Sequence, residues 1–174
     1  MRRDAVQPRP GLLAAGTIAV AAGLALAAAA AGCGAPVDLK QTLQVADTAG
    51  GWYDAGVVDG KNKLVPTVTF RVKKTADVNV RPLSLNVLFR AIDGKESEID
   101  QDVFVQSVTF EGDATAPLNV RAPNGYTADA PQTRAEMLRH TQFRDMRAII
   151  YAKHSSSTWV ELARYDIPRQ LVTK

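Results

Sequence analysis

The chain has 174 residues, of which 46% are apolar and 22% charged, with 12 glycines, 9 prolines and one cysteine. This composition is typical of one globular domain and excludes a collagenous, a disordered and a multi-span membrane protein. The formal net charge of +3 falls to +1 without residues 1–32, which hold three arginines and one aspartate. A nearly neutral remainder gives no reason to expect a nucleic acid as partner.

The N-terminal segment has the pattern of a secretory leader. Arg2, Arg3 and Arg9 precede residues 11–32, which contain eleven alanines and no charge and end directly before Cys33. A basic flank, an apolar run and small residues before a cleavage site follow one another in signal peptides. The basic flank favours a cytoplasmic N-terminus, so we expect the rest of the chain to cross the membrane.

The residues Ala30-Ala31-Gly32-Cys33 resemble the lipobox of bacterial lipoproteins, although Ala30 stands where leucine is usual in that family. The resemblance implies cleavage between Gly32 and Cys33, diacylation of the Cys33 sulfur and a membrane-anchored mature protein that faces the periplasm or the cell exterior. Gly34 in place of aspartate implies the outer membrane if the source is an enteric-type Gram-negative cell. The alternatives are an uncleaved signal anchor and a cysteine buried in the core.

Residues 34–51 mix small and polar residues and end in Gly50-Gly51, which predicts a flexible tether over 33–51 and a folded domain over 52–174. With Cys33 lipidated, no thiol is left for a disulfide or a thiolate metal site. A domain of this size can bury enough apolar surface to be stable on its core alone.

Strand-like segments separated by turn signals predict an all-β fold, a single immunoglobulin-like antiparallel sandwich of about seven strands. These segments are residues 52–58, 64–74, 83–89, 99–110, 116–120, 145–153 and 159–165. In two of them apolar and polar residues alternate, which predicts that the apolar ones face inward: Val68, Phe70, Val72, Leu85, Val87 and Phe89. In the segment 99–110 the parity of the apolar positions shifts, which predicts a bulge or a bend.

The stretch VTFRVKKTADVNVRPLSLNVLFRAIDGKE, Val68 to Glu96, resembles the strand-turn-strand of small immunoglobulin-like modules of the FxLYD kind, which occur in bacterial secreted proteins and lipoproteins. The resemblance consists of an alternation pattern and an Asp-Gly-Lys turn. It implies a fold and not a function.

One short helix is predicted among the strands. Thr133 and Glu136 have the spacing of a capping box, which favours a helix of about two turns through His140. This helix belongs to a long crossover, residues 122–142, and crossovers of that length often bind a partner or cover a sheet edge.

The same crossover provides the candidate binding surface. Asn124, Gly125 and Tyr126 form a turn signal that carries an aromatic ring, and tyrosine offers a large contact area at low entropic cost. Among the aromatic residues we expect Tyr126 to be the most exposed and Trp159 to be largely buried.

An acidic ladder could hold calcium. In an extended strand Glu96, Glu98, Asp100 and Asp102 share one face, and calcium binds carboxylates of this kind. Neighbours on one face of a strand lie ~7 Å apart, too far for one ion to bind all four, so the ladder is predicted to be a solvated edge. A glycosidase pair drawn from it would lack the apolar pocket that raises the pKa of one acid.

Met137 precedes His140 by about one helical turn, and with His154 these residues could bind copper, which accepts thioether and imidazole ligands. Ser155, Ser156 and Ser157 follow His154 without the motif of a catalytic serine.

The sequence therefore predicts a lipid-anchored, non-catalytic accessory or binding module of the cell envelope. The expected partners are the membrane and an envelope protein that the sequence does not identify, and no cofactor is expected. A copper-handling envelope protein is the alternative.

Overall fold

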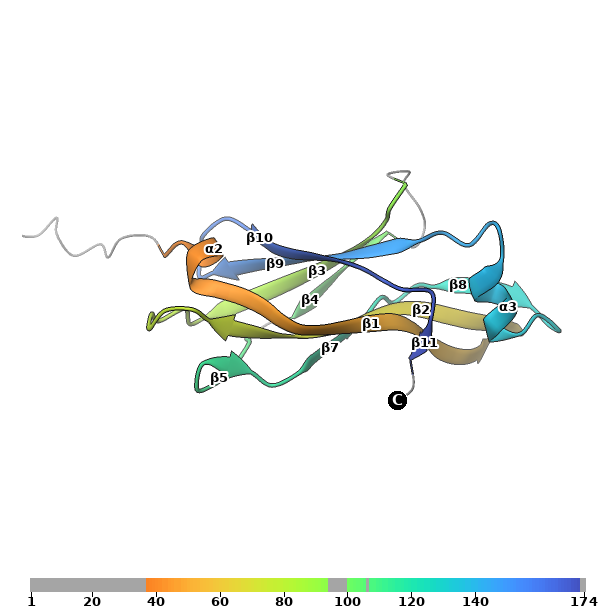
Figure 1. Ribbon diagram of the computed structural model, residues 1–174, viewed down its shortest axis with the longest axis horizontal. Helices are drawn as coiled ribbons and strands as arrows, with labels where there is room; N and C mark the ends of the chain where they lie inside the picture. The colour runs from red at the N-terminus through yellow and green to blue at the C-terminus, as the bar shows by residue number, and fades with distance from the viewer. Residues whose placement is uncertain (1–36, 94–99, 106, 173–174) are drawn as a thin grey trace, which may run out of the picture. The chain divides into compact units, whose positions relative to one another are not determined.

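The computed structural model describes residues 37–93, 100–105 and 107–172. These residues form two β-sheets packed face to face, which confirms the predicted all-β sandwich (Figure 1). Sheet A contains β1 (Leu43–Val58), β2 (Lys61–Lys74), β5 (Phe110–Glu111), β6 (Ala114–Thr115), β7 (Leu118–Arg121), β8 (Tyr126–Asp129) and β11 (Leu171–Val172). Sheet B contains, from edge to edge, β10 (Val160–Asp166), β9 (Met146–His154), β3 (Leu83–Ala91) and β4 (Gln101–Val105).

The described residues form two short helices, which lie at opposite ends of the sandwich. Helix α2 (Leu39–Thr42) precedes β1 at the end where β9 finishes and β10 begins (Figure 1). Helix α3 (Arg134–Arg139) lies between β8 and β9 in the chain, beside the far ends of β1 and β2. All strand pairs are antiparallel except β1 with β11, which run parallel.

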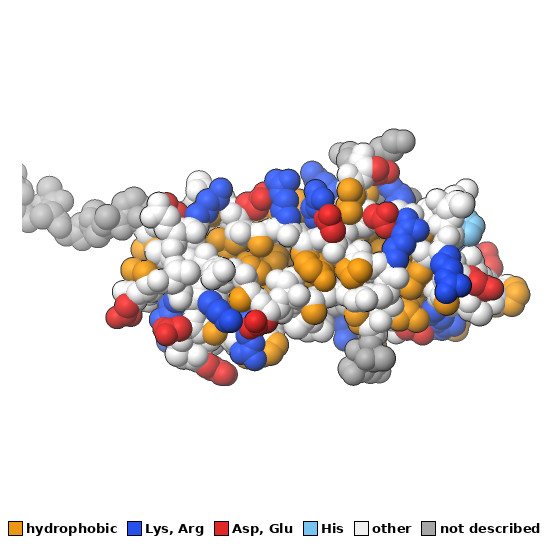
Figure 2. Space-filling model, in the orientation of Figure 1, with side chains coloured by type: hydrophobic (Ala, Val, Ile, Leu, Met, Phe, Trp, Pro, Cys, Tyr) orange, Lys and Arg blue, Asp and Glu red, His pale blue; other side chains and the backbone are white. Residues whose placement is uncertain are grey.

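The core lies between the sheets and follows the alternation of the sequence. All six residues expected to face inward on β2 and β3 have no exposed surface: Val68, Phe70, Val72, Leu85, Val87 and Phe89. Trp52 on β1 and Ile150 on β9 are equally buried. Figure 2 shows hydrophobic side chains along the middle of one side of the molecule, bordered by rows of charged ones.

Strand β2 is the centre of sheet A, because β1 pairs with one of its edges and β6, β7 and β8 share the other. The β1–β2 hairpin turns at Asp59 and Gly60, both of which have positive φ, 51° and 76°. Two successive positive φ angles match the turn type that Asp-Gly favours between antiparallel strands.

The flexible tether expected up to residue 51 is wrong for the part of it that the structure describes. Strand β1 begins at Leu43, and Leu39 and Leu43 are buried in the core. The paired glycines lie within this strand, where a Cβ on Gly50 would lie 2.7 Å from the Thr67 carbonyl oxygen and 2.9 Å from a Tyr165 ring carbon. Glycine marks a close approach of neighbouring strands here and not a flexible linker. Residues 33–36 of the expected tether lie outside the described residues.

The segment 99–110 is not one bent strand. Residues 101–105 form β4 in sheet B, and Phe110 and Glu111 form β5 in sheet A. Between them Ser107 has a φ of 57°, and the Val108 N–H donates a hydrogen bond to the Leu83 carbonyl at 3.0 Å. The parity shift in the sequence thus marks the crossing from one sheet to the other, as occurs at the corners of sandwiches.

Candidate functional site

The capping box predicted at the start of α3 is confirmed. The Thr133 N–H donates to Glu136 Oε2 at 2.7 Å, and the Thr133 hydroxyl oxygen accepts from the Glu136 N–H at 3.3 Å. The hydrogen bond from the Thr133 backbone, followed by the one with its side chain, lowers the pKa of Glu136. The box therefore stabilises the helix above the ordinary carboxylate pKa, and this contribution is lost as the pH falls through the lowered value.

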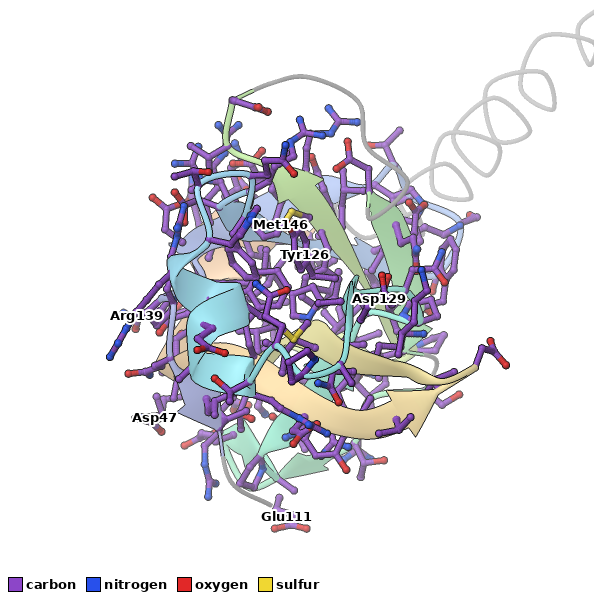
Figure 3. The ribbon with its side chains drawn as sticks, turned by 90° about the vertical axis from the view of Figure 1, so that its right-hand side faces the viewer. Asp47, Glu111, Tyr126, Asp129, Arg139 and Met146 are labelled. Carbon is purple, nitrogen blue, oxygen red and sulfur yellow. The ribbon has the colours of Figure 1, made fainter. Side chains whose placement is uncertain are left out.

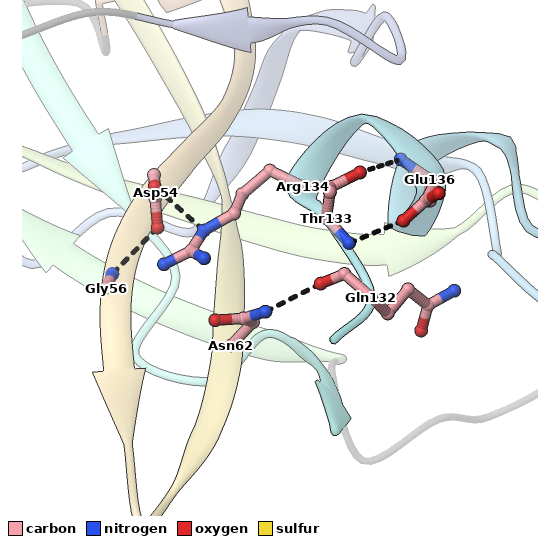
Figure 4. A network of polar contacts seen from close by, with 7 residues as sticks. All are labelled: Asp54, Gly56, Asn62, Gln132, Thr133, Arg134 and Glu136. Carbon is pink, nitrogen blue, oxygen red and sulfur yellow. Dashed lines mark hydrogen bonds and ion pairs between the residues drawn. The ribbon is translucent and has the colours of Figure 1, made fainter. Parts of the chain in front are cut away.

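Two further contacts fasten α3 to the β1–β2 hairpin (Figure 4). Arg134 Nε donates to Asp54 Oδ2 at 3.0 Å, and the buried Asn62 donates through Nδ2 to the Gln132 carbonyl at 2.6 Å. Asp54 also accepts from the Gly56 N–H at 2.8 Å, which fixes the carboxylate that holds Arg134. The polar groups at this end hold the helix in place.

The candidate surface Asn124-Gly125-Tyr126 folds back onto β2. A Cβ on Gly125 would lie 2.1 Å from the Leu64 carbonyl oxygen. Tyr126, labelled in Figure 3, pairs with Leu64 in the sheet and is half-buried. Its ring centroid lies 4.9 Å from that of Phe143. Asn124 is exposed, and its N–H donates to Gln101 Oε1 at 3.0 Å. The expectation that Tyr126 is the most exposed aromatic residue is therefore wrong, because its ring completes the core at this end.

Phe143 is the centre of an aromatic cluster that the sequence did not indicate. Its ring meets that of Trp52 edge-on, with centroids 4.4 Å apart, and the Arg169 guanidinium lies 5.1 Å from the ring centroid. Arg169 also binds Asp145 through two hydrogen bonds of 2.6 and 3.1 Å and donates to the Leu138 carbonyl at 3.3 Å. The hydrogen bonds to Asp145 raise the pKa of Arg169.

The residues of the copper alternative do not come together. Met137 is fully buried, while His140 ends α3 and accepts from the Gln142 N–H at 3.2 Å. His154 ends β9 and contacts the Arg81 carbonyl at 3.1 Å. Strand β9 begins near α3 and runs away from it, and its nine residues place His154 roughly 26 Å from Met146, at the opposite end of the domain (Figure 1). The prediction that these residues form one copper site is therefore wrong.

Within the part of the chain that the structure describes, no three His, Cys, Asp or Glu side chains gather closely enough to hold a metal ion.

The acidic ladder is described only in its second half, because Glu96 and Glu98 lie outside the described residues. Asp100 accepts a hydrogen bond from the Ala91 N–H at 3.0 Å, which satisfies the backbone at the end of β3. Asp102 lies on the exposed face of β4, 3.5 Å from the Asn86 side-chain nitrogen. Asp100 thus has a structural contact that needs no ion.

Calcium should leave the stability of this protein unchanged. Asp100→Asn keeps an oxygen opposite the Ala91 N–H but removes the charge, so we expect a loss of about 1 kcal/mol. Thermal unfolding of the parent and the variant with and without calcium chloride measures both effects. A calcium-dependent rise in the melting temperature of the parent that vanishes in the variant would show instead that the ladder binds the ion.

The serines after His154 form a turn. Ser155 has a φ of 52°, and its N–H donates to the Pro82 carbonyl at 3.1 Å. The Ser157 hydroxyl accepts from the His154 N–H at 3.2 Å. Serines are frequent in such turns because their hydroxyls satisfy nearby backbone groups.

Two exposed aromatic rings lie together on the outer face of sheet B. Phe104 on β4 is 60% exposed and Trp159, just before β10, is 38% exposed, with ring centroids 6.0 Å apart. The Lys153 ammonium lies 5.5 Å from the centroid of the Trp159 ring. We call Phe104, Trp159 and Lys153 the aromatic patch.

The prediction that Trp159 is buried is therefore wrong, and strand alternation gives the reason. Val160 pairs with the buried Ala152 and faces inward, so its neighbour Trp159 projects from the other side of the sheet. The alternation of β9 and β10 is the sequence signal that could have found this exposed ring.

On the outer face of β9 and β10, charged residues neutralise one another in pairs. Arg164 binds Glu161 through two hydrogen bonds of 2.8 and 3.0 Å, and Arg147 binds both carboxylate oxygens of Asp166. These hydrogen bonds lower the pKa of Glu161 and of Asp166. Each pair is solvent-exposed, so its contribution to stability is small.

Comparison of the chain with protein-family models, with curated proteins and with solved structures finds no match in any of the three. Among the described residues, no helix combines the length and the hydrophobicity that a membrane span requires.

Proposed function

We propose that the protein is a lipid-anchored, non-catalytic accessory or binding module of the cell envelope. The observation that carries this proposal is the place of the single cysteine, at the end of an uncharged run that follows three arginines. Lipoprotein processing would make Cys33 the first residue of the mature chain. The described fold begins at Val37, so only Gly34, Ala35 and Pro36 would separate the lipid from the sandwich.

Structural roles of the polar groups support the non-catalytic part of the proposal. Asp145 binds Arg169, the His154 ring contacts the Arg81 carbonyl, and the Ser157 hydroxyl accepts a hydrogen bond within a turn. Each of these side chains therefore has a structural contact and needs no catalytic role to account for its position. An envelope protein is the expected partner, and copper handling is not supported because its ligands lie far apart.

The anchor is tested by replacing the acyl acceptor. Cys33→Ser should abolish the incorporation of a clickable fatty acid and leave an uncleaved precursor, because the thiol accepts the lipid. Immunoprecipitation from labelled cells measures the label, and gel mobility measures the cleavage.

A matched control keeps one thiol in the chain. The double variant Cys33→Ser, Ser156→Cys places it in the exposed turn after β9 and should also carry no label. Label in either variant, or a wild-type protein without label, would contradict the anchor and favour an uncleaved signal anchor.

A further inference from the structure

The end of the sandwich that receives the chain from Cys33 is fixed by covalent geometry. Three residues lie between Cys33 and Val37, and the four Cα–Cα steps of a fully extended chain span at most about 14 Å. Helix α2 follows at once and packs against β9 and β10. A lipid on Cys33 would therefore hold this end of the domain within about 14 Å of the bilayer surface.

The aromatic patch lies at this same end of the domain. Lys153 is the last residue but one of β9, and Trp159 immediately precedes β10. On the other edge of sheet B, Phe104 is the last residue but one of β4. Figure 1 shows that α2 lies beside the end of β9 and the beginning of β10. Lys40 of α2 is close enough to Glu161 on β10 to help lower the pKa of that carboxyl.

The chemistry of the aromatic patch suits a lipid headgroup region. Tryptophan is enriched at membrane interfaces, where its ring is buried and its N–H stays hydrated. Arg164 on the neighbouring strand β10 is already paired with Glu161, whereas the Lys153 ammonium has no carboxylate partner among the described residues. A lysine beside apolar rings is attracted to anionic lipids.

The far end of the domain offers a contrast. Val57, at the tip of the β1–β2 hairpin, is 64% exposed, as apolar and as accessible as Phe104. Strand β1 separates it from α2 by fourteen residues, roughly 45 Å. Because β1 and β2 belong to sheet A, a domain that rests on the outer face of sheet B keeps this tip at least one sheet spacing, about 10 Å, farther from the membrane.

We propose that the domain rests on the bilayer of its own lipid anchor through the aromatic patch, Phe104, Trp159 and Lys153. The inference depends on the proposed lipidation of Cys33. It gives the domain a defined orientation, because the lipid and the patch together hold it at two points. The β1–β2 hairpin tip and α3 then point away from the membrane, where an envelope partner can reach them.

Environment-sensitive labels test the orientation. A lipidated Cys33 has no free thiol, so Phe104→Cys and Val57→Cys each introduce one reactive group into the full chain. The processed lipoprotein is placed in vesicles of phosphatidylcholine and phosphatidylglycerol, and both positions are labelled with the same nitrobenzoxadiazole dye. The label at position 104 should shift its emission to the blue on insertion, whereas the matched label at position 57 should keep its emission in water.

The two tryptophans supply a measurement without a label. Trp52 is fully buried, so quenching by a brominated phosphatidylcholine should act on Trp159. We expect the wild-type lipoprotein to lose the part of its emission that comes from Trp159, and Trp159→Phe to lose almost none. Unchanged melting temperatures of the variants would show that they are folded, as expected for exposed positions.

The outcomes of these experiments test the orientation of the domain and the lipid anchor separately. If the protein floats with vesicles but the label at position 104 stays in water, the orientation is wrong and the aromatic patch is free to bind a protein or a glycan. If the wild-type protein does not float and Cys33 reacts with a maleimide, the proposed lipid anchor is wrong, and the proposed orientation, which depends on it, is wrong too. Replacing phosphatidylglycerol by phosphatidylcholine should weaken the blue shift of the label at position 104. Lys153→Ser should weaken it as well, and an unchanged shift in this variant would contradict the attraction of Lys153 to anionic lipid.

Discussion

Replacement of Gly125 by alanine is expected to lower the free energy of unfolding by about 3 kcal/mol, the upper part of the range for overpacking. The added methyl group would lie 2.1 Å from the Leu64 carbonyl oxygen and 2.7 Å from a methyl group of Val65. Both atoms belong to the central strand β2, which is paired on its two edges and cannot move aside without disturbing sheet A. Urea unfolding followed by circular dichroism measures the loss.

Gly56→Ala is the matched control for this variant. A Cβ on Gly56 meets no atom within 4 Å, but its φ of 82° is unfavourable for alanine. The control should therefore cost about 1–2 kcal/mol, from the left-handed backbone alone. An equal or smaller loss for Gly125→Ala would show that the segment 124–126 can move away from β2, and that it is a loop available for binding.

Phe143→Ala should be the most destabilising of the core truncations near α3, with a loss of about 3–5 kcal/mol. The phenyl ring fills the space between Trp52 and Tyr126 and supports the Arg169 guanidinium, which in turn binds Asp145. Its removal leaves a cavity and opens a path for water to Trp52. The emission of Trp52 should shift to the red in the folded variant, and chemical unfolding gives the free energy.

Phe104→Ala provides the comparison, because the same atoms are removed from a side chain that is 60% exposed. We expect a loss within about 0.5 kcal/mol, as for other surface changes. Similar losses for the two variants would mean that the Phe143 ring contributes little packing, and that the crossover carrying α3 is held by its polar contacts alone. A destabilised Phe104→Ala would assign the exposed ring a structural role.

Strand content follows from local alternation, which is why the inward-facing residues of β2 and β3 could be predicted. Side chains on successive residues of a strand point to opposite faces, so the pattern at Val68, Phe70 and Val72 needs no partner to be interpreted. The capping box at Thr133 and Glu136 is equally local, since both hydrogen bonds close within four residues. The turn at Asp59 and Gly60 depends on the φ angles of its own two residues.

The histidines and the acidic residues are cases in which a local sequence pattern does not predict which side chains lie close together. His140 and His154 are fourteen residues apart, a separation compatible with one site, but a straight strand between them places them at opposite ends of the domain. Asp100 belongs to a periodic run, but its hydrogen bond is to Ala91 on a neighbouring strand. Whether such residues meet depends on the path of the chain between them.

Within the described residues, the sequence by itself determined the all-β class, the inward faces of β2 and β3, and the cap of α3, because each rests on neighbours within a few residues. The leader and the lipidation of Cys33 stay predictions of the sequence. Only the tertiary structure decided that β8 and β11 are strands, that Gly50 and Gly125 are sites of close packing, and that Trp159 is exposed. Short strands and glycine contacts are stabilised by a partner distant in the chain, and that partner's position is set by the packing of the whole sandwich.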